Sequence, residues 1–171
     1  MPRKMIDPKR QSKGGRTPLP STAMAYTGPR QEKDAGEWVM FRDDFLKRTA
    51  GEQIVTIRNG VQITNLVGFA NSVQAPRESV YHLVGVSTST VKRKLVKGEL
   101  LDAVATERLV RLGAIEKQAE DAFGNRDLAH HWLRTTNPGL GGVEPLSILD
   151  TEVGCREVSR VLNAIAYGGV A

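Results

Sequence analysis

Apolar residues recur at three- and four-residue intervals through most of this chain, which is the spacing of one face of an α-helix. The longest amphipathic stretch runs from 102 to 123, and a second covers about 155 to 167. Four residues of the second stretch share one stripe: Val158, Val161, Leu162 and Ile165. A shorter stretch at 37–48 carries three aromatic residues at helical spacing: Trp38, Phe41 and Phe45. The pattern predicts an all-α fold, and no internal repeat is visible.

Turn and capping residues divide the middle of the chain into short helices. Pro76 suits the first turn of a helix that breaks at Gly85. Ser87 then caps a helix through Lys97, which ends at Gly98. Two helices that meet across such a turn are typical of a helix-turn-helix.

The C-terminal part is divided in the same way. Gly124 and Asn125 stop the long helix, and Asp127 can cap the next, which is expected to reach about residue 135. A turn follows at 137–139, and Pro145 opens a short helix to residue 149.

Residues 54–63 allow two interpretations. Asn59-Gly60 between β-branched residues is a strong hairpin signal. Gly60 would serve equally as the left-handed residue that closes a helix, and the residues after it have helical spacing. We favour two helices joined at Gly60.

The sequence predicts three regions: a basic arm at 1–50, a helix-turn-helix region with the long helix at 51–124, and a C-terminal region at 125–171. Residues 1–35 are rich in proline, glycine and charge, so we expect them to form a flexible basic arm, which a short helix around Trp38 follows within the first region. Residues 1–33 hold eight basic and two acidic side chains, whereas 127–171 holds three basic and five acidic ones. The basic end favours polyanions, unless it is merely a solvated tail.

The whole chain carries a net charge of +5 over 171 residues. Cys155 is the only cysteine, so no internal disulfide can form, and a reducing cytoplasm is the expected location. No apolar run is long enough to span a bilayer, and Met1 to Arg16 lacks the apolar core of a secretory signal. We therefore expect a soluble protein that does not enter a membrane.

The helix expected at 88–97 has the residues of a DNA reader. Val91 and Leu95 are predicted to point inward, which leaves hydroxyls and cations on the outer face. Arginine can bridge a guanine edge, and lysines and hydroxyls mainly contact the phosphate backbone. The alternative is a cationic surface turn of a helical bundle. The candidate DNA-binding residues are Ser87, Thr88, Ser89, Lys92, Arg93, Lys94 and Lys97.

The C-terminal residues form an ordered series, and the order is a more specific family signal than any single residue in it. It begins with Trp132-Leu133, Asn137-Pro138 and Leu140-Gly141-Gly142, and continues through Pro145-Leu146 to Tyr167-Gly168. This series resembles the toxin-binding domain of the Xre/MbcA/ParS antitoxins, the partners of RES-domain toxins. The resemblance extends back through the helix that starts at Ser87 and covers about residues 51–171, so residues 1–50 fall outside it.

The resemblance implies an all-α antitoxin that dimerises, represses its own operon through the helix-turn-helix, and masks a RES toxin that consumes NAD or uses it to ADP-ribosylate a target. It implies no catalysis by the antitoxin and no cofactor. The short tail after Gly168 is placed to reach the partner. The rival is a stand-alone regulator whose C-terminal module only dimerises. The resemblance also implies which residues form the toxin-binding module, namely those at the positions of the family's motif. These candidates are Trp132, Leu133, Asn137, Pro138, Leu140, Gly141, Gly142, Pro145, Leu146, Tyr167 and Gly168.

No catalytic or metal set is predicted. His130 and His131 are adjacent, so they face different sides of a helix, and a surface or interface role is expected for them. Ser147 and Ser159 lack a nucleophile-elbow setting, and Gly139 to Gly142 is not a phosphate loop. Three acidic residues are expected to form a solvated helix face: Glu116, Glu120 and Asp121.

Overall fold

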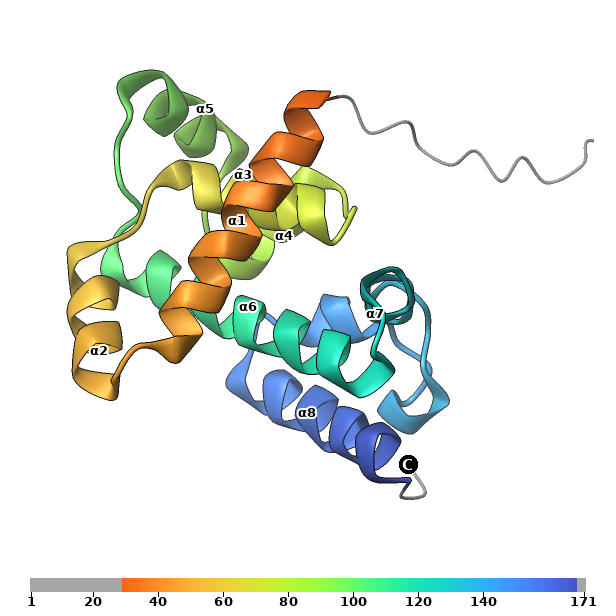
Figure 1. The fold of residues 1–171 in the computed structure, drawn as a ribbon. Coiled ribbons are helices and arrows are strands. Elements are labelled where there is room, and N and C mark those ends of the chain that lie inside the picture. Colours follow the sequence, from red (N-terminus) through yellow and green to blue (C-terminus); the bar gives the residue numbers. More distant parts are fainter. Residues whose placement is uncertain (1–28, 169–171) are drawn as a thin grey trace, which may run out of the picture.

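The computed structural model describes residues 29–168, and all the regular elements in that part of the chain are helical (Figure 1). The predicted all-α fold is confirmed. The N-terminal half contains α1 (Pro29–Lys47), α2 (Ala50–Asn59), α3 (Ile63–Ser72), α4 (Arg77–Val84) and α5 (Thr88–Lys97). The C-terminal half contains α6 (Ala103–Phe123), α7 (Arg126–Leu133), the 3-10 turns η1 (Pro138–Leu140) and η2 (Pro145–Ile148), and α8 (Glu152–Tyr167).

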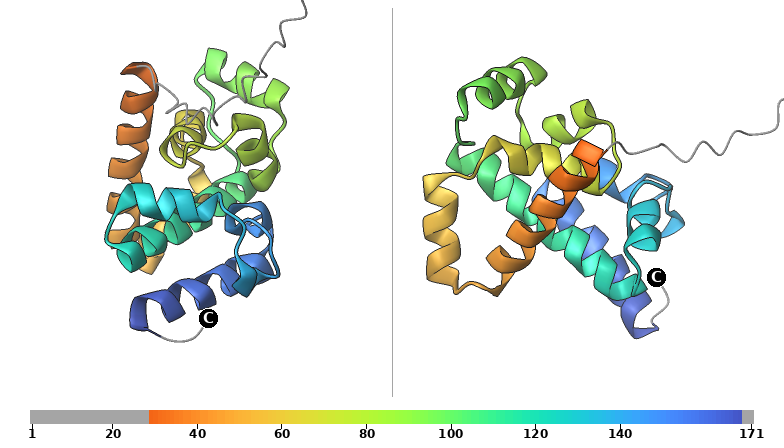
Figure 2. Two further views of the ribbon diagram at one scale, coloured as in Figure 1. Left: turned by 90° about the vertical axis from the view of Figure 1, so that its right-hand side faces the viewer. Right: turned by 45° about the horizontal axis from the view of Figure 1, so that its top comes forward.

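Helix α6 is the central element, and it contacts α1, α2, α4, α7 and α8. In all three views α5 and α8 lie at opposite ends of the molecule (Figures 1 and 2). No helix of the described residues is long and apolar enough to cross a membrane. The predicted arm before Pro29 and the predicted tail after Gly168 lie outside the described residues.

Helix α1 is longer than the short helix predicted around Trp38. Residues 29–35, which their composition assigned to the flexible arm, form its first two turns. Trp38 is 1% exposed and meets Phe69 of α3 edge to face at 5.5 Å. Two glycines make room for it, because a Cβ on Gly68 would lie 2.7 Å from the Cβ of Trp38, and one on Gly113 would lie 2.8 Å from its ring. Burial of this large aromatic side chain stabilises the helix, and composition alone could not show it.

Residues 54–63 follow the second of the two interpretations, because α2 and α3 meet at Gly60 and no hairpin forms there. Gly60 has φ +79°, and a side chain there would collide with the Leu101 carbonyl oxygen. The Leu101 amide donates to the Val61 carbonyl at 2.8 Å, which ties the start of α3 to the segment before α6. A capping box between Thr49 and Glu52 starts α2.

The helix-turn-helix consists of α4 and α5, with the predicted boundaries. Gly85 takes the left-handed conformation at φ +75°, and the Ser87 side chain accepts from the Thr90 amide at 3.2 Å. Val91 is buried as predicted, but Leu95 is wrong as an inward residue, since it is 39% exposed. Val91 is the one fully buried residue of α5, so the end of the helix stands away from the core.

In the C-terminal half two helices start earlier in the structure than the sequence predicted. Asn125, not Asp127, caps α7, because its side chain accepts from the Leu128 amide at 3.0 Å. Helix α7 also ends at Leu133, short of residue 135. Thr151 caps α8, which therefore starts three residues before Cys155. Asp102 and Gly124 bound α6 as predicted.

Candidate functional site

The predicted DNA-binding residues gather on α5 and at its N-terminal cap. Ser87 and Ser89 are exposed, and the Ser87 hydroxyl lies 3.0 Å from that of Ser89. Thr88 and Lys94 are half-buried. The helix thus presents hydroxyls at its N-terminus, where backbone amides attract phosphate, and cations along the rest of its surface. The exposed cations are Lys92, Arg93 and Lys97.

A carboxylate that sequence reasoning missed lies among these cations. Glu99 is 3.1 Å from Arg93, 3.5 Å from Lys94 and 3.9 Å from Lys97. Lys94 also donates to the Leu100 carbonyl at 2.6 Å, so part of its hydrogen-bonding capacity is used inside the protein. Glu99 follows the left-handed turn at Gly98, and helical spacing therefore gives no signal that it folds back onto α5.

The predicted toxin-binding series divides into core residues and surface residues. Leu133, Pro145 and Leu146 are buried, and half-buried Trp132 packs on Phe123 with ring centroids 5.7 Å apart. These side chains hold α7 and η2 in place. They can contribute to toxin binding mainly by shaping the module.

The loop from Asn137 to Gly142 is a closed turn. The Asn137 side chain accepts from the Gly139 amide at 2.8 Å, and its carbonyl accepts from the Gly142 amide at 2.9 Å. Gly141 and Gly142 both have positive φ, at +73° and +80°, so glycine is needed at both positions. Leu140 is half-buried, whereas Pro138, Gly141 and Gly142 are exposed.

Helix α8 joins this loop to the end of the described chain. It packs on both η1 and η2, and Arg160 donates to the Gly139 carbonyl at 3.4 Å. Two turns further on, Tyr167 is 87% exposed, and Gly168 closes the helix at φ +69°. Tyr167 is thus an exposed aromatic side chain, a residue type that is enriched at protein–protein interfaces.

A buried polar cluster occupies the region where α1, α3, α6 and α7 meet. Its centre is Glu116, which is fully buried, so the predicted solvated face is wrong at this residue. The Glu116 carboxylate accepts from Trp38 at 2.7 Å and from Ser72 at 2.6 Å. Arg42 lies 3.0 Å from it, and His130 also 3.0 Å. All four partners come from helices other than α6, so protein side chains compensate the buried carboxylate.

The structure confirms some of the other predicted positions in this region and corrects the rest. His130 is buried, which corrects its predicted surface or interface position, whereas His131 is exposed. Glu120 is partly buried and binds Arg42 at 2.8 Å, and Asp121 is exposed as predicted. The set Trp38, Arg42, Ser72, Glu116, Glu120 and His130 is called the Glu116 cluster below.

Mutual contacts set the protonation states of this cluster. Burial alone would raise the pKa of Glu116, but hydrogen bonds from His130, Ser72 and Trp38 and the charge of Arg42 outweigh burial and lower it. Burial would also raise the pKa of Glu120, but hydrogen bonds from His130 and Arg42 outweigh it and lower the pKa to about 2. Burial opposes the charged form of His130, yet its bonds to both carboxylates raise its pKa. The cluster is therefore ionic.

Glu116, Glu120 and His130 are close enough together to hold a metal ion by distance alone. The guanidinium of Arg42 bridges the two carboxylates, with contacts of 3.0 and 2.8 Å. A metal would have to displace this cation and break the bond between His130 and Glu116. The arrangement is that of a structural ion cluster.

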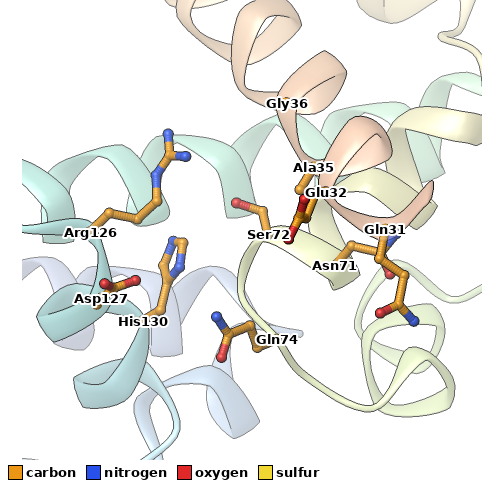
Figure 3. A pocket seen from close by; sticks show the side chains of 10 residues that line it. All are labelled: Gln31, Glu32, Ala35, Gly36, Asn71, Ser72, Gln74, Arg126, Asp127 and His130. Atoms are coloured by element: carbon orange, nitrogen blue, oxygen red, sulfur yellow. The ribbon is translucent and has the colours of Figure 1, made fainter. Parts of the chain in front are cut away.

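A polar pocket of about 260 Å³ adjoins the cluster (Figure 3). Arg126 and His130 of α7 line one side of it, and Glu32 of α1 with Asn71 and Ser72 of α3 lines the other. Its lining lacks the apolar and aromatic walls of a typical small-molecule site. The pocket is the solvent-facing edge of the junction between these helices.

Comparison with known proteins finds two antitoxin domain families in this chain. Residues 52–113 match the antitoxin Xre-like helix-turn-helix domain, and residues 118–168 match the antitoxin Xre/MbcA/ParS C-terminal toxin-binding domain. The first match contains α4 and α5, and the second contains α7 and α8.

Relatives that match over most of this chain are also antitoxins. A Prs ADP-ribosylating antitoxin of Sphingobium sp. (strain YBL2) is 27% identical over 154 residues, which cover 85% of this chain and 97% of the relative. The antitoxin Xre of Photorhabdus laumondii is 26% identical over 125 residues, covering 72% of this chain and 84% of that protein. The antitoxin Xre of Yersinia enterocolitica is 24% identical over 131 residues, covering 75% and 88%.

The Sphingobium match covers more of the chain than residues 51–171 can supply. The likeness to that relative therefore reaches into the first fifty residues, whereas the matches to the two family models begin at residue 52, in agreement with the expected range of about 51–171. Since both domain types occur in the expected order, and antitoxins match over most of their own length, the chain belongs to the Xre/MbcA/ParS antitoxins and combines an Xre-like helix-turn-helix domain with a C-terminal toxin-binding domain.

Proposed function

We propose that this antitoxin neutralises a RES-type toxin, which consumes NAD or ADP-ribosylates a target, and that it represses its own operon from the cytoplasm as a homodimer. Neutralisation is by binding, and the antitoxin performs no catalysis. The observation that carries the proposal is the presence of both domain types in one chain. The name of the Sphingobium relative, a Prs ADP-ribosylating antitoxin, supports the choice of toxin class.

The two activities are assigned to opposite ends of the molecule. Operator DNA is bound by α5, through the hydroxyls at its N-terminus and through Arg93 and Lys97. The toxin is bound by the surface of the 138–142 loop and the end of α8, with Tyr167 as the exposed aromatic contact. The separation of α5 from α8 supports this division, because one partner need not displace the other (Figures 1 and 2).

The toxin half is tested by searching for a RES-domain gene beside this one and co-expressing its product with the antitoxin. Tyr167→Asp should weaken the purified complex at least tenfold and reduce growth rescue, because it places a charge at the centre of the proposed contact. Val153→Asp is the matched control, since Val153 is an exposed apolar residue on the same helix. If Tyr167→Asp binds and rescues as the unaltered protein does, the end of α8 is not the toxin contact. If the neighbouring protein is not bound at all, the stand-alone regulator is favoured.

The DNA half is tested with the duplex upstream of the gene. Arg93→Ala with Lys97→Ala should weaken binding and reduce the salt dependence by roughly one unit per lost phosphate contact, while toxin binding stays intact. Lys47→Ala with Arg58→Ala removes the same charge from exposed positions of α1 and α2 and serves as the control. Equal effects of the two pairs would show that only net charge matters and that α5 is not the reader.

A further inference from the structure

We propose that Glu99 is a positioning residue that orients Arg93 to read a guanine in the operator. The proposal rests on the proposed use of α5 for DNA binding and adds how one base is selected. Glu99 lies one residue beyond the cap of α5, outside the helix that carries the predicted reading residues.

The contact between the two side chains uses one nitrogen of Arg93. Its Nη1 lies 3.2 Å from one carboxylate oxygen of Glu99 and 3.1 Å from the other. Within residues 29–168, Nε and Nη2 of Arg93 make no hydrogen bond. Guanine presents two acceptors, O6 and N7, in the major groove, and arginine reads them with two parallel N–H groups. The Nε and Nη2 edge provides such a pair while Nη1 stays on Glu99.

The backbone that carries Glu99 is itself fixed. Gly98 makes a left-handed turn at φ +65°, and the Glu99 amide donates to the Lys94 carbonyl at 3.0 Å. Two residues later the Leu101 amide donates to the Val61 carbonyl at the start of α3. Lys94 contributes a second anchor, since its ammonium contacts Glu99 at 3.5 Å and donates to the Leu100 carbonyl at 2.6 Å. Glu99 is therefore held in place before DNA arrives, as a positioning residue must be.

The contact between Arg93 and Glu99 adds too little to the stability of the fold to explain its presence. The side chains of Arg93 and Glu99 are 52% and 34% exposed, and ion pairs at such exposure add little to folding. A carboxylate close to phosphates also weakens binding to any DNA sequence, because it offsets part of the attraction from three cations. A gain in base selection balances that loss, since an arginine with a fixed guanidinium distinguishes guanine better than a freely rotating one.

The test compares two duplexes with the full-length protein. One carries the sequence that the protein selects from a random pool, and the other carries the same bases in shuffled order. Glu99→Gln should bind the shuffled duplex several-fold more tightly and the selected duplex no more tightly, so that discrimination falls roughly tenfold. Glu107→Gln is the control, because Glu107 pairs with Arg111 on α6 at 3.1 Å and its loss changes the net charge equally. It should leave discrimination unchanged.

Further variants distinguish the alternatives. Arg93→Ala should reduce discrimination by itself, and Glu99→Gln should reduce it no further in that background. Replacement of one selected guanine by 7-deazaguanine, which lacks the N7 acceptor, should weaken binding of the unaltered protein but not of Arg93→Ala. Equal tightening on both duplexes would overturn the proposal, because Glu99 would then only oppose phosphates. A selected sequence without guanine would also overturn it. If Arg93→Ala with Lys97→Ala has no effect on either duplex, the DNA half of the proposed function fails first.

Discussion

Replacement of Arg42 by methionine should destabilise the whole protein. Methionine keeps an unbranched apolar side chain in place of the arginine stem and removes the guanidinium. The Arg42 side chain is 2% exposed and contacts three carboxylates: Glu116 at 3.0 Å, Glu120 at 2.8 Å and Asp43 at 2.9 Å. Without Arg42, Glu116 keeps its hydrogen bonds with Trp38, Ser72 and His130 but loses the guanidinium that bridges it to Glu120.

The expected loss follows from this burial. Removing one partner of a buried ion pair costs about 3–5 kcal/mol, because the other charge stays buried without compensation. A domain of this size loses roughly 2–4 °C in Tm per kcal/mol, so Arg42→Met should melt about 6–20 °C lower. Arg48→Met, one residue beyond the end of the same helix, is the matched control. Arg48 pairs with Asp44 at 2.6 Å in a largely exposed setting, and such pairs contribute at most about 1 kcal/mol.

Thermal and urea unfolding at neutral pH, followed by circular dichroism, measure both variants. The slope of the free energy against urea should stay unchanged, since the fold and the area exposed on unfolding are the same. Glu120→Gln added to Arg42→Met should recover part of the loss, because one uncompensated carboxylate is removed. If Arg42→Met falls within about 1 kcal/mol of Arg48→Met, the Glu116 cluster does not stabilise the junction and its ionic description is wrong.

Two further predictions concern the same junction. The pKa of Glu120 is lowered from 4.5 to about 2, so its contribution to stability is present above pH 4.5 and is lost as the pH falls toward 2. The pKa of His130 is raised above 6.5, so its contribution is present below pH 6.5 and is lost as the pH rises through the higher value. Tm measured from pH 2 to 9 should show both declines. His130→Asn should remove the alkaline decline and weaken the acid one, because His130 also lowers the pKa of Glu120. Gly113→Ala should cost about 1–3 kcal/mol, because its Cβ would lie 2.8 Å from the Trp38 ring, whereas Gly51→Ala, with open space around it, should be neutral or slightly stabilising in the same melts. Identical melting curves for the two glycine variants would contradict the close packing at Trp38.

Local chemistry was sufficient to predict the helix-turn-helix from the sequence. Gly60, Gly85 and Gly98 end helices in the structure with positive φ, as their positions between periodic stretches predicted. Ser87 caps α5 because a serine hydroxyl can accept from an amide three residues later. These signals act within a few residues, and a single sequence contains all of them.

The Glu116 cluster could not be predicted because its contacts are long-range. A glutamate on an amphipathic helix is normally solvated, and only its partners show otherwise. Trp38 lies 78 residues from Glu116 in the sequence, and Ser72 lies 44 residues from it. The contact of Glu99 with α5 could not be predicted for a different reason. The turn at Gly98 reverses the chain and breaks the helical spacing from which the DNA-binding residues were predicted. Charged residues just after a helix end are therefore worth considering with the helix that they follow.

The position of Glu116 bears on how variants of this antitoxin should be interpreted. It lies between the residues matched to the two domains, 52–113 and 118–168, and its partners come from α3 on one side and α7 on the other. Helix α1, which precedes both matches, supplies Trp38 and the cation that neutralises the carboxylate. The helix-turn-helix and the toxin-binding domain thus share one buried charge and one covering helix. A change in this cluster should alter DNA binding and toxin binding together through folding, whereas changes on the exposed faces of α5 and α8, the surfaces proposed for the two partners, should separate the two activities.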